Sequence, residues 1–355
     1  MKVLLLGEFS GFHNNLKQGL EELGHQVVLA ASGDGFKQLK TDIDLGSARL
    51  GFAGTLERVI KSLKFAYMAR GFDVVQLINP NIFPSGFGLN SKIISRIIKN
   101  NSKVFLSACG DDFFYVTKGC SSMRYSPIPD ALVYDYKSSR HPYDNEKDRV
   151  WLEKLSSTVA GVIPVVHEYV LGYQHCDKLR PAIPLPINTR LIEYSENVVK
   201  EKLVVFHGLN RYGFKGTRFV EQAFDYLRAK YPDELELVIA GGLPLEQYLK
   251  LMQRTNVVID QVSSYSCGMN ALYALAMGKV VLGGAEPEGL AEFGIEQTPV
   301  INITPSAESI ILAIENLLAS REEISALGAA GRCFVEQYHS HLKIAGWYVK
   351  EWDQA

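Results

Sequence analysis

The sequence predicts an α/β protein made of two Rossmann-like, doubly wound parallel-sheet domains that face each other across a cleft. Three observations lead to this prediction. The chain has 355 residues, which is more than one ordinary core needs and enough for two domains. Short buried strands alternate with amphipathic helices in its first half. The same alternation begins again near residue 202, as in parallel sheets with helical crossovers.

The first half opens with a strand, KVLLLG, then a glycine-containing loop and an amphipathic helix, NNLKQGLEELG. A second strand, HQVVLAA, completes a βαβ unit, whose crossover is right-handed. The same reasoning extends over the rest of this half. Further strands are predicted at 72–78, 103–108 and 159–166, and helices at 55–69 and 91–99.

The second half restarts with a strand at 202–208, the loop NRYGFKG and a helix, TRFVEQAFDYLRAKY, that is apolar on one face. Residues 180–189 contain three prolines, so they are predicted to form an extended hinge. Ligands of such sheets bind at the carboxyl ends of the strands, which predicts a site in the cleft. Further strands are predicted at 234–242, 256–262 and 279–284, and the domains at 1–185 and 190–333.

The composition, with 47% hydrophobic and 21% charged residues, is that of a soluble globular protein. The apolar run at the N-terminus is too short for a secretion signal, and no run approaches the roughly 20 residues of a membrane span. The five scattered cysteines show no metal-ligand or disulfide spacing, which predicts reduced thiols in a cytoplasmic protein.

Charge is shared unevenly between the halves. Residues 1–190 hold 23 Lys and Arg against 18 Asp and Glu, a net +5, and residues 191–355 hold 14 against 21, a net −7. These sum to the formal −2 of the chain. The first half is therefore expected to meet an anionic partner, but nucleic acid would require a much more basic face.

One short stretch, SYSCGMNALYALAMGK at 264–279, predicts an anion site. Its loop of small residues leads into a strongly helix-forming stretch, and Gly278 is predicted to end that helix. The backbone N–H groups at Cys267, Gly268 and Met269 would then lie free at a helix N-terminus, where anions bind. A plain buried helix is the alternative interpretation.

The ordered run HGLNRYGFKGT (207–217), VIAGG, NVVIDQV and CGMNALYALAMGKVV resembles the C-terminal domain of GT-B glycosyltransferases, most closely those of the retaining family 4 type. The resemblance implies that the C-terminal domain binds a nucleotide sugar and the N-terminal domain a saccharide or lipid-linked acceptor. It implies that residues 334–352 cross back onto the first domain. It also implies metal-independent transfer in cell-surface polysaccharide synthesis, with no cofactor besides the donor.

In the family, a basic pair after the first strand of the second domain binds the donor diphosphate. Arg211 and Lys215 match it, although the spacing is four residues and the family's is usually five. Two family glutamates correspond to Tyr265 and Tyr273, and a phenol cannot accept hydrogen bonds as a carboxylate does. Candidate substitutes for binding the sugar and ribose are Asn270, Glu286 and Glu288.

In the first half, Gly11 resembles the close-approach glycine of the acceptor loop, with His13 beside it. Asp111 and Asp112 follow a predicted strand and are candidates for positioning the acceptor hydroxyl. A helix cap for His13 and turn chemistry for the aspartates are the alternatives. No protein nucleophile and no metal site is predicted.

The helices at 55–69 and 91–99 are amphipathic and basic. They are candidates for peripheral contact with the inner face of a membrane, and packing on the sheet is the alternative. For the whole chain, a catalytically degenerate sugar-nucleotide-binding or scaffolding protein is the alternative function. A sugar-nucleotide epimerase is a third, for which no suitably placed carboxylates are identified.

Overall fold

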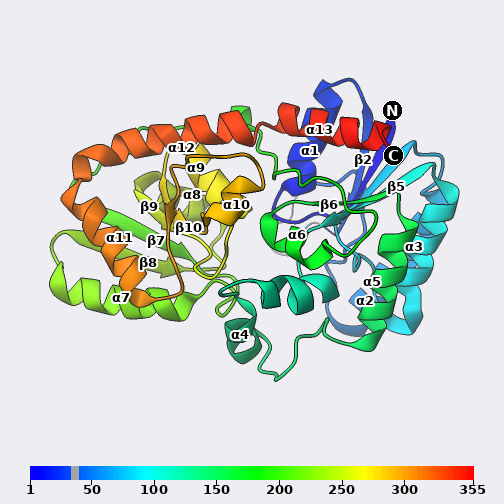
Figure 1. Cartoon of the computed structure of the whole chain (residues 1–355), viewed down its shortest axis with the longest axis horizontal. Coiled ribbons are helices and arrows are strands. Elements are labelled where there is room, and N and C mark those ends of the chain that lie inside the picture. The colour runs from blue at the N-terminus through cyan, green and yellow to red at the C-terminus, as the bar shows by residue number, and fades with distance from the viewer. Residues whose placement is uncertain (33–39) are drawn as a thin grey trace. The chain divides into compact units, whose positions relative to one another are not determined.

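The computed structural model describes residues 1–32 and 40–355, which form two compact units (Figure 1). Each unit is built on a parallel sheet with helices between its strands, which confirms the predicted fold class. The first unit comprises Met1–Gly119, Tyr143–Asn188 and His341–Ala355; the second comprises Cys120–Pro142 and Thr189–Ser340.

The sheet of the first unit has six parallel strands in the order β3-β2-β1-β4-β5-β6. Strand β1 lies in the middle, with Leu4 opposite Val28 on one side and Val75 on the other. Four of its five residues are buried, as expected for a strand covered on both faces. The strands are β1 (Lys2–Leu6), β2 (Gln26–Ala31), β3 (Ile43–Asp44), β4 (Val74–Leu77), β5 (Lys103–Ala108) and β6 (Gly161–Pro164).

The helices of this unit lie on both faces of the sheet. Right-handed crossovers place the helix between β1 and β2 on one face and those between β3, β4, β5 and β6 on the other. The predicted helices at 55–69 and 91–99 are present as α2 and α3. The helices are α1 (Phe12–Glu22), α2 (Gly51–Met68), α3 (Leu89–Asn100), α5 (Glu146–Thr158), α6 (His167–Tyr173) and α13 (His341–Asp353).

Helix α13 packs along α1, and Figure 1 shows the two side by side. A Cβ atom added at Gly19 of α1 would lie 2.3 Å from the carbonyl oxygen of His341, so a larger residue would separate the helices. Trp352 at the end of α13 is fully buried, and its indole N–H donates to Gln76 Oε1 on β4 at 3.0 Å. This late segment therefore completes the core of the first unit.

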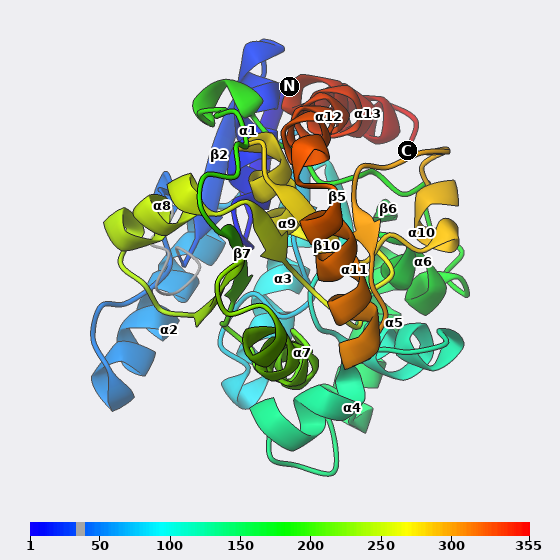
Figure 2. The same ribbon diagram turned by 90° about the vertical axis from the view of Figure 1, so that its left-hand side faces the viewer.

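The second unit has five parallel strands in the order β11-β10-β9-β7-β8. The strands are β7 (Leu203–Gly208), β8 (Leu235–Ala240), β9 (Val257–Ile259), β10 (Val280–Gly283) and β11 (Ile301–Asn302). The main helices are α7 (Thr217–Lys230), α8 (Leu245–Arg254), α9 (Met269–Ala276), α10 (Pro287–Ala291), α11 (Ala307–Ala319) and α12 (Ile324–Tyr338). Figure 2 shows β7 and β10 of this sheet with helices around them. The buried core of the unit packs the strands against two helices that lie next to each other, α7 and α11.

The units differ from the predicted domains 1–185 and 190–333 in two places. The segment Cys120–Pro142, with the short helix α4 (Ile128–Asp130), makes its contacts in the second unit. Residues 334–340 also belong there, because α12 continues to Tyr338 and only α13 joins the first unit. Within residues 1–32 and 40–355, no helix has the length and apolar character needed to cross a bilayer.

Candidate functional site

The predicted anion site centres on a buried ion pair in the second unit. Lys215 lies just before α7, and its ammonium group pairs with the carboxylate of Asp260, which follows β9. The two side chains are only 5% and 4% exposed. Parallel strands end at the same edge of a sheet, so the loops after β7 and β9 bring these two residues together.

A buried histidine, His207, links the two strands and the helix next to this ion pair. His207 on β7 has Nδ1 3.0 Å from the carbonyl oxygen of Ile259 and Nε2 3.0 Å from Thr217 Oγ1. Burial, with the nearby charge of Lys215, lowers the pKa of His207 to about 4. The ring is therefore neutral at pH 7: Nδ1–H donates to the carbonyl, and Nε2 accepts from the threonine hydroxyl. His207 thus ties together β7, β9 and the start of α7.

The N-terminus of α9 lies beside the ion pair. A Cβ atom added at Gly268, the residue before this helix, would lie 3.6 Å from Asp260 Oδ2 and 3.4 Å from Gln261 Nε2. Met269 is buried, and Cys267 Sγ lies 3.4 Å from the carbonyl oxygen of Gly284. Met269 can therefore offer only its backbone N–H group to a ligand. Gly278 ends the helix with φ +84°, which confirms the predicted stop.

The segment Cys120–Pro142 fastens the loop that carries Arg211. The Arg211 guanidinium stacks 3.9 Å from the ring centre of Phe214 and donates to the hydroxyl of Tyr136 at 3.0 Å. The carboxylate of Asp135 accepts from the backbone N–H groups of Gly213 and Phe214, both at 2.9 Å. This segment therefore fixes the conformation of the predicted phosphate loop.

The same segment contacts the acids that follow β10. Arg124 forms ion pairs with both Glu286 and Glu288, and the hydroxyl of Tyr125 donates to buried Glu286. The backbone N–H of Arg124 donates to the hydroxyl of Tyr265 at 2.7 Å, and its guanidinium lies 4.8 Å from the Tyr265 ring centre. Tyr265 thus serves as a docking point for the segment.

We expect Arg124→Met to loosen this segment, because it removes the cation shared by Glu286 and Glu288. Limited digestion with proteinase K should cut within residues 120–142 several-fold faster than in the wild type. Lys137→Met is the matched control. Lys137 is an exposed cation of the same segment, and it forms no ion pair within the described residues. Equal cleavage of all three proteins would mean that Arg124 does not hold the segment.

Two of the residues predicted to bind the sugar and ribose lie on α9. Asn270 and Tyr273 are both half-buried on this helix, one turn apart. Glu288 is 40% exposed at the start of α10. Of the predicted sugar-binding and ribose-binding side chains, Tyr265 is buried, whereas Asn270, Tyr273 and Glu288 reach the surface of the unit.

In the first unit, the predicted acceptor loop follows β1. Gly11 has φ +92° and precedes α1, whose N-terminus is capped by Glu8: the carboxylate accepts from the N–H groups of Gly11 and Asn14, both at 2.8 Å. His13 is fully buried, with Nδ1 2.8 Å from the carbonyl oxygen of Gly7. Burial lowers the pKa of His13 to about 3, so its ring stays neutral. Its Nε2 has no hydrogen-bond partner among the described residues.

The predicted aspartates lie at the carboxyl end of β5, close to the loop after β1. A Cβ atom added at Gly110 would lie 2.8 Å from the ring of Phe9. Asp112 is fully buried, and its carboxylate accepts from Tyr115 N at 2.8 Å and from the Tyr173 hydroxyl at 2.6 Å. Asp112 therefore caps the helical turn that follows it, whereas Asp111 is half-buried.

Burial raises the pKa of Asp112 from 3.8 to about 6. Between these values the folded protein holds a proton that the unfolded chain has lost, so the group's contribution to stability falls as pH rises from about 4 to 6. The total is on the order of 3 kcal/mol. We expect Asp112→Asn to remove this dependence. The difference in unfolding free energy between variant and wild type, measured in urea, should then grow over that window.

Asp177→Asn is the control for this titration, because Asp177 is an exposed aspartate of the same unit. A difference for Asp112→Asn that stays constant from pH 4 to 7 would contradict the assignment. Within residues 1–32 and 40–355, no group of three or more His, Cys, Asp and Glu side chains is placed to hold a metal ion.

No family model and no curated protein matches this sequence. Solved structures do match it along its whole length. The chain is similar to a sucrose-phosphate synthase from Thermosynechococcus elongatus, with 16% identity, a TM-score of 0.64, and 100% of this chain and 99% of the other covered. It is also similar to HepE from Anabaena, solved with UDP and glucose, with 12% identity, a TM-score of 0.65 and both chains fully covered.

A UDP-GlcNAc 2-epimerase from Neisseria meningitidis, solved with UDP-GlcNAc, is similar too, with 13% identity, a TM-score of 0.52 and both chains fully covered. At such identities the likeness establishes the fold, so this chain has the GT-B fold. Since transferases and an epimerase share that fold, the function has to be argued from the site.

Proposed function

We propose that this protein is a glycosyltransferase that moves a sugar from a nucleotide sugar to a saccharide or lipid-linked acceptor. The observation that carries the proposal is the Lys215–Asp260 pair beside the N-terminus of α9. It places a fixed cation beside a helix N-terminus where the second unit of a GT-B fold ends its strands. The similar structures that hold UDP and a sugar support this choice of ligand.

In the proposed reaction, the bond between the anomeric carbon and the diphosphate breaks, and charge grows on the phosphate oxygens. The α9 N-terminus, Lys215 and Arg211 stabilise that charge. Lys215 has three N–H donors, so it can bind a phosphate oxygen while it stays paired with Asp260. No metal ion is needed to neutralise the leaving group in this scheme.

We propose that the transfer proceeds with retention, as the family 4 resemblance implies. The acceptor oxygen bonds to the anomeric carbon, and its proton passes to an oxygen of the departing phosphate, so no protein nucleophile takes part. Glu288, Asn270 and Tyr273 bind the hydroxyls of the sugar and ribose. On the acceptor side, Asp111 positions the hydroxyl, and the fully buried His13 holds the loop after β1 through its bond to the carbonyl oxygen of Gly7. The transfer belongs to a pathway of cell-surface polysaccharide synthesis in the cytoplasm.

A second candidate is a sugar-nucleotide-binding protein without transfer activity. The observation that favours it is the hydrogen bond between the backbone of Arg124 and Tyr265. By the family resemblance, Tyr265 stands where a glutamate would bind the sugar, and here it contacts the segment 120–142 instead. Such a protein would bind a nucleotide sugar through the same phosphate contacts and would release it unchanged.

Calorimetry without metal, with UDP, GDP, ADP and their common sugars, tests the donor site. Selective binding of one nucleotide supports the site and identifies the base, and no binding of any of them would refute the proposal. Incubation of the bound donor with acceptors then separates the two candidates: release of nucleoside diphosphate indicates a transferase, and an intact donor with every acceptor indicates a binding protein. Isomerised donor without acceptor would indicate an epimerase.

A further inference from the structure

Helix α2 of the first unit exposes a row of large apolar side chains. Phe52 is 83% exposed and Tyr67 66%, and three aliphatic residues between them are more than 40% exposed. Spacings of three and four residues place them on one side of the helix. The residues that α2 buries (Gly54, Ser62, Phe65 and Ala66) lie on its other side. We call Phe52, Leu56, Ile60, Leu63 and Tyr67 the α2 row.

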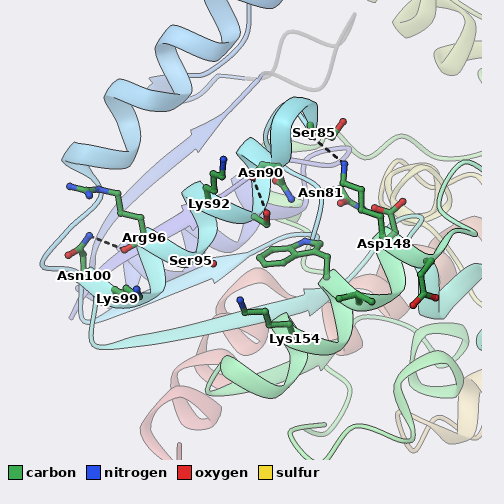
Figure 3. A pocket seen from close by; sticks show the side chains of 16 residues that line it. Asn81, Ser85, Asn90, Lys92, Ser95, Arg96, Lys99, Asn100, Asp148 and Lys154 are labelled. Carbon is green, nitrogen blue, oxygen red and sulfur yellow. Dashed lines mark hydrogen bonds between the residues drawn. The ribbon is translucent and has the colours of Figure 1, made fainter.

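A basic groove of about 1010 Å³ lies next to this helix, between α3 and α5 (Figure 3). Lys92 and Lys99 of α3 and Lys154 of α5 line it, and none of them forms an ion pair within the described residues. The lining also holds two acids, Glu146, which pairs with Arg149, and Asp148, which keeps its charge. Five cationic side chains stand against them: Lys92, Arg96, Lys99, Lys147 and Lys154. The groove therefore has an uncompensated positive charge.

One arginine joins the groove to the α2 row. The guanidinium of Arg96, which lines the groove, lies 4.2 Å from the ring centre of Tyr67. Helices α2, α3 and α5 also lie on the same face of the sheet, because their crossovers have the same hand and direction. The row and the groove are thus two parts of one surface.

A strained residue adds a further apolar group at this surface. Phe87 is fully exposed and has φ +53°, a conformation that a bulky residue adopts only at a cost. It lies between Gly86 and Gly88, and Gly88 lines the groove. Such an exposed aromatic gains no burial within the chain to offset its strain.

We propose that this surface binds an anionic lipid bilayer, with the α2 row and Phe87 in the headgroup–acyl boundary and the lysines on the phosphates. An apolar phase beside a layer of negative charge matches both parts of the surface. A symmetric pairing of two copies through the same face would bring the uncompensated lysines of both together, which opposes it. The sequence predicted contact through 55–69 and 91–99 alone; the structure adds α5 and Phe87.

The consequence for chemistry rests on the proposed function: the acceptor would be carried on a lipid, and the first unit would reach it at the bilayer surface. Vesicle binding by itself is independent of nucleotide binding. The two proposals can therefore fail separately.

The test is co-sedimentation of the full chain with vesicles of phosphatidylcholine, with and without phosphatidylglycerol. We expect binding only to the anionic vesicles, weakened by salt. Replacing Lys92, Lys99 and Lys154 by Gln should lower the partition coefficient roughly 100-fold, about fivefold for each lysine. Phe87→Ser with Leu63→Ser should also reduce it, and this loss should persist at high salt, because apolar insertion is not screened.

The matched control replaces Lys200, Lys202 and Lys250 of the second unit by Gln, which removes the same charge from another surface. Circular dichroism and UDP calorimetry on every variant show whether the fold and the donor site are intact. Equal binding to neutral and anionic vesicles, an equal loss in the control variant, or no binding would overturn the proposal. So would a dimer, found by light scattering, that the Phe87→Ser, Leu63→Ser variant dissociates.

Discussion

Lys215→Met should destabilise the second unit by about 3–5 kcal/mol, because it leaves the buried carboxylate of Asp260 without its partner. Unfolding in urea at pH 7 measures this loss as a lower midpoint. The same variant should lose affinity for nucleoside diphosphate, so the single substitution mixes two effects. Its result alone cannot assign Lys215 to the phosphate site.

The double variant Lys215→Met, Asp260→Leu separates them. Replacing both members of a buried pair by apolar residues is often neutral, so most of the lost stability should return. Affinity for nucleoside diphosphate should remain weaker than wild type by about 1.5–3 kcal/mol, the value of a lost charged hydrogen bond. Wild-type affinity in a stably folded double variant would show that Lys215 has only a structural role.

Trp352→Ala should destabilise the first unit by about 3–5 kcal/mol through the cavity that it leaves. The indole is fully buried, packs 5.7 Å from the ring centre of Tyr348 and donates to Gln76. The backbone carbonyl of Trp352 also accepts from the ammonium group of Lys103 at 2.8 Å. A lower midpoint in thermal or urea unfolding, read from the signal of the first unit, is the expected observation.

Trp347→Ala is the control on the same helix. Trp347 is 38% exposed, and its only described ring contact is with the ammonium group of Lys343, 5.9 Å away. Its loss should cost a small fraction of the effect at Trp352. Equal effects of the two substitutions would mean that α13 contributes through its helix as a whole and not through the buried indole.

The long strands and helices could be predicted from the sequence because their signals are local. Buried runs such as Val3–Leu6 and the helical pattern of 55–69 need no distant partner to be recognised. The two-residue strands β3 and β11 could not be, since a pair such as Ile301–Asn302 has no pattern of its own and is a strand only because Leu282 and Gly283 lie beside it. The sequence could not place Cys120–Pro142 in the second unit for the same reason, since its partners there, such as Glu286, lie far along the chain.

The site was predictable to a similar extent. Lys215 and Gly268 carry motif signals, and Asp260 stands as a lone acid at the end of an apolar strand, which could have indicated its pairing. Arg124 has no such signal: it lies 162 residues from Glu286 along the chain, and only the fold brings them together. Likewise, Asp112 is interpreted from the sequence as a turn residue or a catalytic group, and only the structure shows that it caps the following turn by accepting from the backbone N–H of Tyr115.

The contribution of α13 to the first unit has a consequence for how the protein is made. The core around Gln76 stays open until Trp352 has been synthesised, and by then the ribosome has already produced all of the second unit. The usual order, in which an N-terminal domain folds first during translation, is therefore not available to this chain. We expect the nascent first unit to expose an apolar face until α13 joins it.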